Sequence, residues 1–288
     1  MSAADVELAA PLVRSRRPAI GGRFLLSEIG MLLRRRRNQL ILLVLFAVPV
    51  IIGVAVKLAS RTGSVTGGLI GNITNNGIFV SFTALVVVIP VFLPMAVSVV
   101  AGETVSGEAN PGTLRYLLAV QVSRTRLLIT KFIAMGAWSL LITTTVAVGG
   151  LLIGFALFPK GDVTLLSGTE TSMAGGLGRL LLIVGYGSLM MLALSAVGLF
   201  ISTLTEVPIA AMAATLTVAI VMQVLVAVPQ LHGLHPFLLS NYVLDFGDLL
   251  RDPLVFNGLS DGVLVALAYI AIFTSLAWAR FTNKDVTS

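Results

Sequence analysis

The stretch IFVSFTALVVVIPVFLPMAVSVVAG at residues 78–102 contains no Asp, Glu, Lys or Arg. A helix of roughly 18 or more apolar residues is long enough to cross the hydrocarbon core of a bilayer. The apolar residues follow one another continuously and do not alternate with polar ones, as the strands of a membrane β-barrel require. The stretch therefore predicts a membrane-spanning helix.

The same pattern recurs along the 288 residues, of which 57% are apolar and 11% charged, with a mean hydropathy of +1.00. Charged residues are absent from 38–56, 62–102, 132–159, 180–205, 207–244 and 262–279. Such runs predict an all-α integral membrane protein with a transmembrane domain over 38–279. We expect six spans, near 39–57, 78–102, 132–158, 178–204, 208–229 and 262–279.

The cations divide unevenly between the loops that six spans would create. Most of the 19 Lys and Arg fall on the side of the amino terminus, namely Arg14, Arg16, Arg17, Arg23, Arg34, Arg35, Arg36, Arg37, Arg115, Arg124, Arg126, Lys131, Arg280 and Lys284. Positive loops stay in the cytoplasm. Both termini are therefore expected inside, with 1–19 as a disordered tail and 280–288 as a second tail. No basic region is large enough to read nucleic acid, so the net charge of +6 is assigned to topology.

Residues 20–37 have apolar residues at helical spacing and end in four consecutive arginines. This pattern predicts an amphipathic helix lying along the inner membrane surface against anionic lipid headgroups. Ordinary positive-inside anchoring explains the arginines equally well.

Two spans carry features that are open to a functional or a packing interpretation. Pro90 and Pro94 lie one turn apart in the second span and predict a kink or a broken turn, which is either a hinge or a static packing feature. Gly150 with Gly154, and Gly198 with Ser202, are pairs of small residues that favour close helix packing.

The segment between the fifth and sixth spans is too long for a simple turn. Leu239, Val243, Phe246 and Leu250 recur at helical spacing there, with acidic residues on the other face and Pro253 after them. They predict an amphipathic helix on the outer side, either resting in the interface or re-entering the membrane. It is interpreted as an outer gate or as a lid over the bundle.

Catalytic and metal motifs are weak. His232 and His235 have a spacing that suits a metal but lack a defined third ligand, so no metal site is expected. The sequence GLSDG at 258–262 matches a hydrolase motif, but it follows a loop and not a strand. No nucleotide-binding loop of the form Gly-x-x-x-x-Gly-Lys-Ser/Thr occurs, and there is no cysteine. We expect no enzyme activity from the chain itself and no bound cofactor.

Polar residues concentrate in one inner segment between the second and third spans. Glu103 and Glu108 begin it, and Arg115, Arg124 and Lys131 follow. Asn110 and Pro111 are typical of a helix start, so a short helix is expected from 111 to about 120 with Leu114 on its apolar face. The segment is predicted to form a helical elbow under the membrane.

The sequence ETVSGEANPGTLRYLLAVQVSRTRLLITK at 103–131 resembles the permease subunits of ABC-2-type ATP-binding cassette transporters. The resemblance rests on its Val-Ser-Gly-Glu, Gly-Thr-Leu-Arg, Leu-Leu and Val-Ser-Arg elements, and the six-span layout extends it to nearly the whole chain. One position departs from the family pattern, since Gln121 stands where the family commonly has proline.

The resemblance implies that the inner helix couples the spans to a separate ATPase subunit. Glu103 and Glu108 would then contact or orient toward that subunit, Gly112 and Thr113 would shape the elbow, and Leu114 would lie in the docking helix. Arg115 and Arg124 would pair with acidic groups on the partner or with phosphates. Two ATPase copies carrying ATP and Mg²⁺, a second permease copy or a related permease, and membrane lipids are the implied partners, in the cytoplasmic membrane of a bacterium.

The expected function is ATP-driven export of a hydrophobic or amphiphilic compound such as a drug or a lipid. Three alternatives stay open at this point. They are an ATP-independent carrier or channel, a permease-like transmitter of force or signals to an envelope partner, and an intramembrane hydrolase using Ser260.

Overall fold

A computed structural model describes residues 22–61, 68–109, 124–165, 167–253 and 257–283. Six of its helices are long and apolar enough to cross a membrane, which confirms the all-α membrane fold. They are α2 (Arg36–Arg61), α4 (Ile78–Ala109), α6 (Arg124–Leu157), α7 (Met173–Leu204), α8 (Pro208–Val226) and α10 (Asn257–Asn283). Each contains the corresponding predicted span or most of it, and α2, α4, α6, α7 and α10 extend beyond the apolar runs.

The connecting elements are short. Helix α1 (Gly22–Arg34) precedes the spans, and α3 (Gly68–Asn75) lies before α4. A two-stranded antiparallel hairpin of β1 (Val163–Thr164) and β2 (Glu170–Thr171) joins α6 to α7. Between α8 and α10 the described residues, 227–253, form four short pieces. They are the 3-10 turns η1 (Pro229–Leu231), η2 (His235–Phe237) and η3 (Asp245–Leu250) and the single-turn helix α9 (Leu239–Tyr242).

Helix starts follow local sequence signals. Asn76 caps α4, because its Oδ1 accepts the backbone N–H of Ile78 at 3.0 Å, and its Nδ2 donates to the carbonyl oxygen of Gly161 at 2.8 Å. The hydroxyl of Ser172 accepts the N–H of Gly175 at the start of α7, and Pro208 occupies the first turn of α8 as expected.

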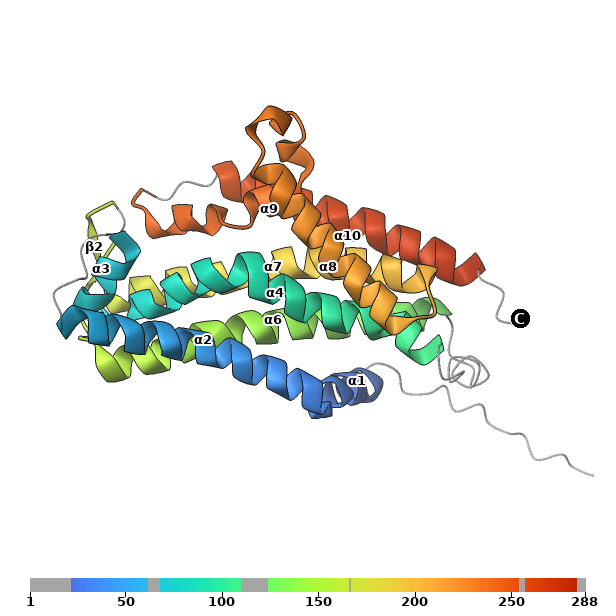
Figure 1. Ribbon diagram of the computed structural model, residues 1–288, viewed down its shortest axis with the longest axis horizontal. Coiled ribbons are helices and arrows are strands. Elements are labelled where there is room, and N and C mark those ends of the chain that lie inside the picture. The colour runs from blue at the N-terminus through green and yellow to red at the C-terminus, as the bar shows by residue number, and fades with distance from the viewer. Residues whose placement is uncertain (1–21, 62–67, 110–123, 166, 254–256, 284–288) are drawn as a thin grey trace, which may run out of the picture.

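Helices α4 and α7 form the centre of the bundle. In their most apolar stretches 56% and 72% of residues are buried, against 22% in α2 and 17% in both α8 and α10. Helix α4 packs against α2, α6, α7 and α8, and α8 runs obliquely across α4 and α7 (Figure 1). The outer faces of α2, α8 and α10 are therefore left to lipid or to other proteins.

Small residues permit the closest helix approaches. A Cβ added at Gly150 would lie 2.5 Å from Cα of Ser81 in α4, and one added at Gly154 would overlap the backbone of Gly77. Gly198 packs on Ala101 in the same way. Both predicted pairs of small residues are confirmed as packing positions, as expected where lipid removes the hydrophobic drive between helices.

Candidate functional site

The helices alternate in direction, so the cations gather at one end of the bundle. This basic end, as we name it, carries Arg34, Arg35, Arg36, Arg37, Arg124, Arg126, Lys131 and Arg280. Helix α1 and the end of α10 lie toward this same end of the bundle, on opposite sides of it (Figure 1). The opposite end carries Lys57, Arg61, Lys160, Arg179 and Arg251 among a larger number of acidic residues. The Lys and Arg residues that were assigned to opposite sides of the membrane from the sequence therefore lie at opposite ends of the molecule.

The predicted coupling segment is described only at its two ends. Gly112, Thr113, Leu114 and Arg115 lie outside the described residues, as does the short helix expected over 111–120. Glu108 belongs to α4, but its side chain is also outside the described part. Glu103 in α4 and Arg124 at the start of α6 are both described, and each is held by a different part of the chain.

Glu103 is the hub of an ion-pair cluster. Arg37 donates to both carboxylate oxygens, from Nη1 to Oε1 and from Nη2 to Oε2, each at 2.6 Å. Arg35 donates from Nη1 to Oε2 at 2.5 Å. The Glu103 side chain is 20% exposed, and those of Arg37 and Arg35 are 40% and 52% exposed. Such a two-pronged arginine–carboxylate contact fixes geometry as well as charge.

The cluster joins α4 to the elbow between α1 and α2. The amphipathic helix ends at Arg34, Arg35 forms the break, and α2 begins at Arg36, so the arginine run spans the elbow. Asn38 Nδ2 donates to the carbonyl oxygen of Leu32 at 2.8 Å and braces the bend. From the sequence, these arginines were expected to contact lipid headgroups, and their contact with Glu103 was not predicted. One signal was available, because Glu103 directly follows the apolar run 78–102 and the four arginines directly precede the first span.

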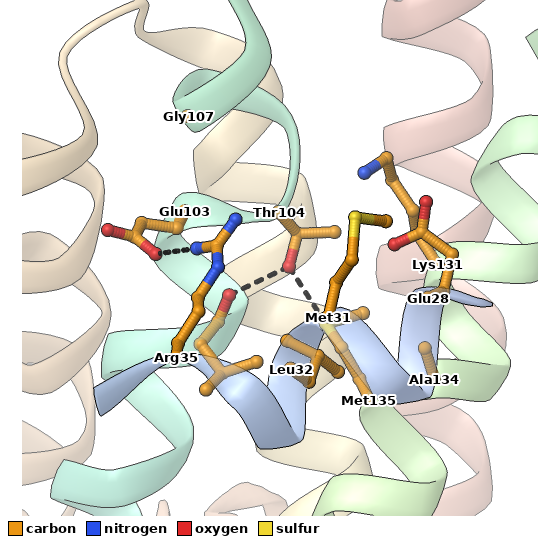
Figure 2. Close-up of a pocket in the computed structure, with 11 residues that line it drawn as sticks. Glu28, Met31, Leu32, Arg35, Glu103, Thr104, Gly107, Lys131, Ala134 and Met135 are labelled. Carbon is orange, nitrogen blue, oxygen red and sulfur yellow. Dashed lines mark hydrogen bonds and ion pairs between the residues drawn. The ribbon is translucent and has the colours of Figure 1, made fainter. Parts of the chain in front are cut away.

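A pocket of about 80 Å³ lies beside this cluster, between α1, α4 and α6. Glu28 and Arg35 line it from α1 and the elbow, Thr104 from α4, and the buried Lys131 from α6 (Figure 2). The Thr104 hydroxyl lies 2.8 Å from the carbonyl oxygen of Val100, to which it donates, and 3.5 Å from the sulfur of Met135. The pocket has a volume of a few water molecules and is lined by both signs of charge.

Arg124 binds the end of the last helix. Its Nη1 donates to the backbone oxygens of Thr282 at 2.9 Å and Phe281 at 3.3 Å, where α10 would otherwise leave carbonyl groups unpaired. Beside it, Trp278 Nε1 donates to the hydroxyl of Thr125 at 2.9 Å. The sequence reasoning paired Arg124 with a partner protein and missed this contact within the chain.

A serine on α7 completes the connections at the basic end. The hydroxyl of Ser202 accepts the N–H groups of Val105 and Ser106, both at 3.0 Å, and donates to the oxygen of Gly102 at 2.8 Å. Ser202 was predicted only as a small packing residue. The end of α4 is therefore tied to α7 by Ser202 and to the α1–α2 elbow by Glu103, while the start of α6 is tied to α10.

The proposed hinge lies in a helix that the structure keeps intact. Helix α4 continues through Pro90 and Pro94, so the alternative of a broken turn was wrong. The Ser98 hydroxyl donates to the carbonyl oxygen of Pro94 at 2.7 Å, a bond from a serine side chain to the backbone four residues earlier. The hinge role stays a prediction.

The outer segment has the predicted buried face but not the predicted helix. Leu239, Val243, Phe246 and Leu250 are all buried, whereas the segment is broken into α9 and η3. Hydrogen bonds from α7 take backbone carbonyls that a continuous helix would use. Tyr186 of α7 donates its hydroxyl to the backbone oxygen of Tyr242 at 2.8 Å. From the same helix, Arg179 Nη1 donates to the Leu249 oxygen at 2.6 Å. The segment packs onto the bundle, which does not test its role as a gate.

The other residues that the sequence motifs pointed to carry little chemistry. Among the described residues no three His, Cys, Asp or Glu side chains are grouped to hold a metal ion, and His232 and His235 lie in short turns after α8. Ser260 lies in the first turns of α10 beside an apolar groove. In η3, burial and the carboxylates of Asp248 and Asp261 raise the pKa of Asp245 above its ordinary value.

Comparison with known proteins adds one finding. A family model described as "Protein of unknown function (DUF2705)" matches residues 46–287, which include five of the six spans entirely and most of α2. No match was found among curated proteins. The chain therefore belongs to the DUF2705 family.

Proposed function

We propose that this member of the DUF2705 family is the transmembrane permease subunit of an ABC-2-type ATP-binding cassette transporter, which moves its substrate at the expense of ATP hydrolysed by a separate subunit. The observation that carries the proposal is the polar connection from Glu103 to Lys131, with its resemblance to that family's coupling segment. The six spans and the amphipathic helix before them are compatible with the same layout.

The contacts at the basic end supply a route by which a push on the coupling segment reaches the spans. The segment leaves α4 at Ala109 and enters α6 at Arg124. A displacement of the first point pulls on Glu103, and through Arg37 on α2. A displacement of the second point, at the start of α6, moves Arg124, and the bond from Arg124 to the carbonyl of Thr282 passes that movement to α10. Rigid-body movements of this kind are how packed bundles change between two states.

The walls of the bundle support a proposal for the substrate class. No Asp, Glu, Lys or Arg lies in the middle of a described span. Proton and ion pathways usually carry such groups, so a hydrophobic or amphiphilic compound, such as a drug or a lipid, suits these helices better. Two copies of the chain, or one copy and a related permease, together with two ATPase subunits would form the transporter.

The proposal is tested by co-purification from bacterial membranes with a soluble ATPase that carries Gly-x-x-x-x-Gly-Lys-Ser/Thr. We expect the two proteins to associate in detergent, and Arg115→Glu in the coupling segment to weaken the association. Arg61→Glu is the matched control, because Arg61 is an exposed arginine at the opposite end of the bundle. Gradient-driven flux by the purified chain alone, with no associated ATPase, would favour a carrier or channel and reject the proposal.

A further inference from the structure

A groove of about 280 Å³ runs between α2 and α4 on the outside of the bundle. Its floor includes Leu45 and Ala96, which are 2% and 3% exposed. Its rim includes Leu40 and Val44 on α2 and Met95 on α4, which are between 47% and 61% exposed. The small side chain of Ala96 leaves the hollow open between larger apolar neighbours.

The groove begins at the basic end, and its length along α2 is close to the thickness of the hydrocarbon part of one lipid leaflet. Arg37 lines its head, and Leu45 lies two turns further along the same face of α2. The helix rises roughly 1.5 Å per residue, so these two residues are separated by about 12 Å along the axis. One leaflet contributes about 15 Å to the hydrocarbon core. An acyl chain that enters beside the arginines therefore matches the length of the groove.

The head of the groove carries positive charge that the described carboxylates do not neutralise. Arg37 is committed to Glu103 through both of its Nη atoms. Arg36 is exposed and lies one helical turn before Leu40, on the face that forms the rim. Arg34 is exposed as well, and no described carboxylate pairs with Arg34 or Arg36. Within the part of the chain that the structure describes, one carboxylate, that of Glu103, thus pairs with two of the four consecutive arginines.

We propose that this groove binds one acyl chain of an anionic phospholipid, with its phosphate held by Arg36 and the neighbouring Arg34. Apolar walls hold the acyl chain, and these two arginines, with which no described carboxylate pairs, select the charge of the headgroup. The assignment does not depend on the transport proposal, because it uses only the membrane-spanning fold and the surface between α2 and α4.

The chain contains a reporter for this site. Trp138 is 2% exposed and donates its Nε1 to the oxygen of Ala96 at 3.3 Å, directly behind the floor of the groove. Trp278 is the second tryptophan and is 48% exposed. In Trp278→Phe protein, fluorescence therefore reports on Trp138 alone. Acyl chains that carry bromine quench it when they occupy the groove.

The experiment uses the full chain with Trp278→Phe in phosphatidylcholine vesicles that contain a minor fraction of brominated phosphatidylglycerol. We expect stronger quenching than the mole fraction predicts, and no such excess when phosphatidylcholine carries the bromine. Arg36→Gln should lower the preference for phosphatidylglycerol about fivefold, since one arginine near an anionic surface contributes about a factor of five in binding. Equal quenching by both lipids in the starting protein would overturn the proposal.

A charge-conserving variant separates the groove from general attraction to the surface. Val44→Phe fills the groove and leaves every arginine in place, so it should abolish the excess quenching. Val54→Phe is the control, because Val54 lies further along α2 at 41% exposure and outside the groove. Retained preference in Val44→Phe would show headgroup adsorption only and reject the site, as would retained preference in Arg36→Gln. Size-exclusion profiles verify that each variant remains folded.

Discussion

Glu103→Ala removes the carboxylate that joins α4 to the α1–α2 elbow and leaves Arg37 half-buried without its charge partner. Hydrogen bonds to charged groups contribute about 1.5–3 kcal/mol when shielded, and exposed ion pairs about 0.2–1 kcal/mol. Glu103 is 20% exposed and Arg37 is 40% exposed, which places this pair between the two cases. We expect a loss of about 2 kcal/mol, which lowers Tm by about 4–8 °C in a domain of this size.

The assay is thermal unfolding of the purified full chain in detergent, read as a double-mutant cycle with Arg37→Ala. If the bridge forms, the double variant loses less stability than the sum of the two single variants, by about 1 kcal/mol or more. Glu28→Ala is the control, because Glu28 lines the neighbouring pocket and has no ion pair among the described residues. Additive losses in the cycle would refute the contact between Glu103 and Arg37.

Three further outcomes are expected. Gly150→Ala should destabilise the bundle by about 1–3 kcal/mol through the clash with Ser81, whereas Gly30→Ala, with open space around it, should not, as thermal unfolding can measure. Arg124→Gln should speed hydrogen exchange at the end of α10 by removing the charged donor to Phe281 and Thr282, while exchange in α8 stays unchanged. Asp245→Asn should raise Tm at pH 7, because the folded protein loses stability as pH rises through the raised pKa of the Asp245 carboxyl and this group ionises. The gain in Tm should shrink as pH falls through that raised pKa toward the ordinary Asp value of 3.8, below which it should be lost.

The positions of the spans could be predicted from the sequence because the bilayer imposes a single requirement on each. A charge-free run must form a helix long enough to cross, so the run 78–102 already determined α4. The packing role of small residues such as Gly154 could also be predicted, since a close approach of two helices needs small side chains at helical spacing.

The contacts at the basic end could not be predicted in the same way. Glu103 and Arg37 are far apart in the chain, and their pairing depends on how α2 and α4 pack. The outer segment illustrates a second limit. Its apolar spacing identified the buried face at Phe246, but bonds from Tyr186 and Arg179 to backbone carbonyls compete with the regular helix. Periodicity identifies which side chains are buried and does not include such tertiary bonds.

The central claim, that the coupling segment between α4 and α6 forms the contact with an ATPase subunit, is tested most directly by site-specific cross-linking. The chain contains no cysteine, so a single one can be placed without altering a native site. Thr113→Cys should cross-link to the ATPase subunit in membranes, and Arg61→Cys at the opposite end of α2 should not. Absence of a cross-link from Thr113→Cys in a chain that co-purifies with the ATPase, or equal cross-linking from both positions, would contradict the claim.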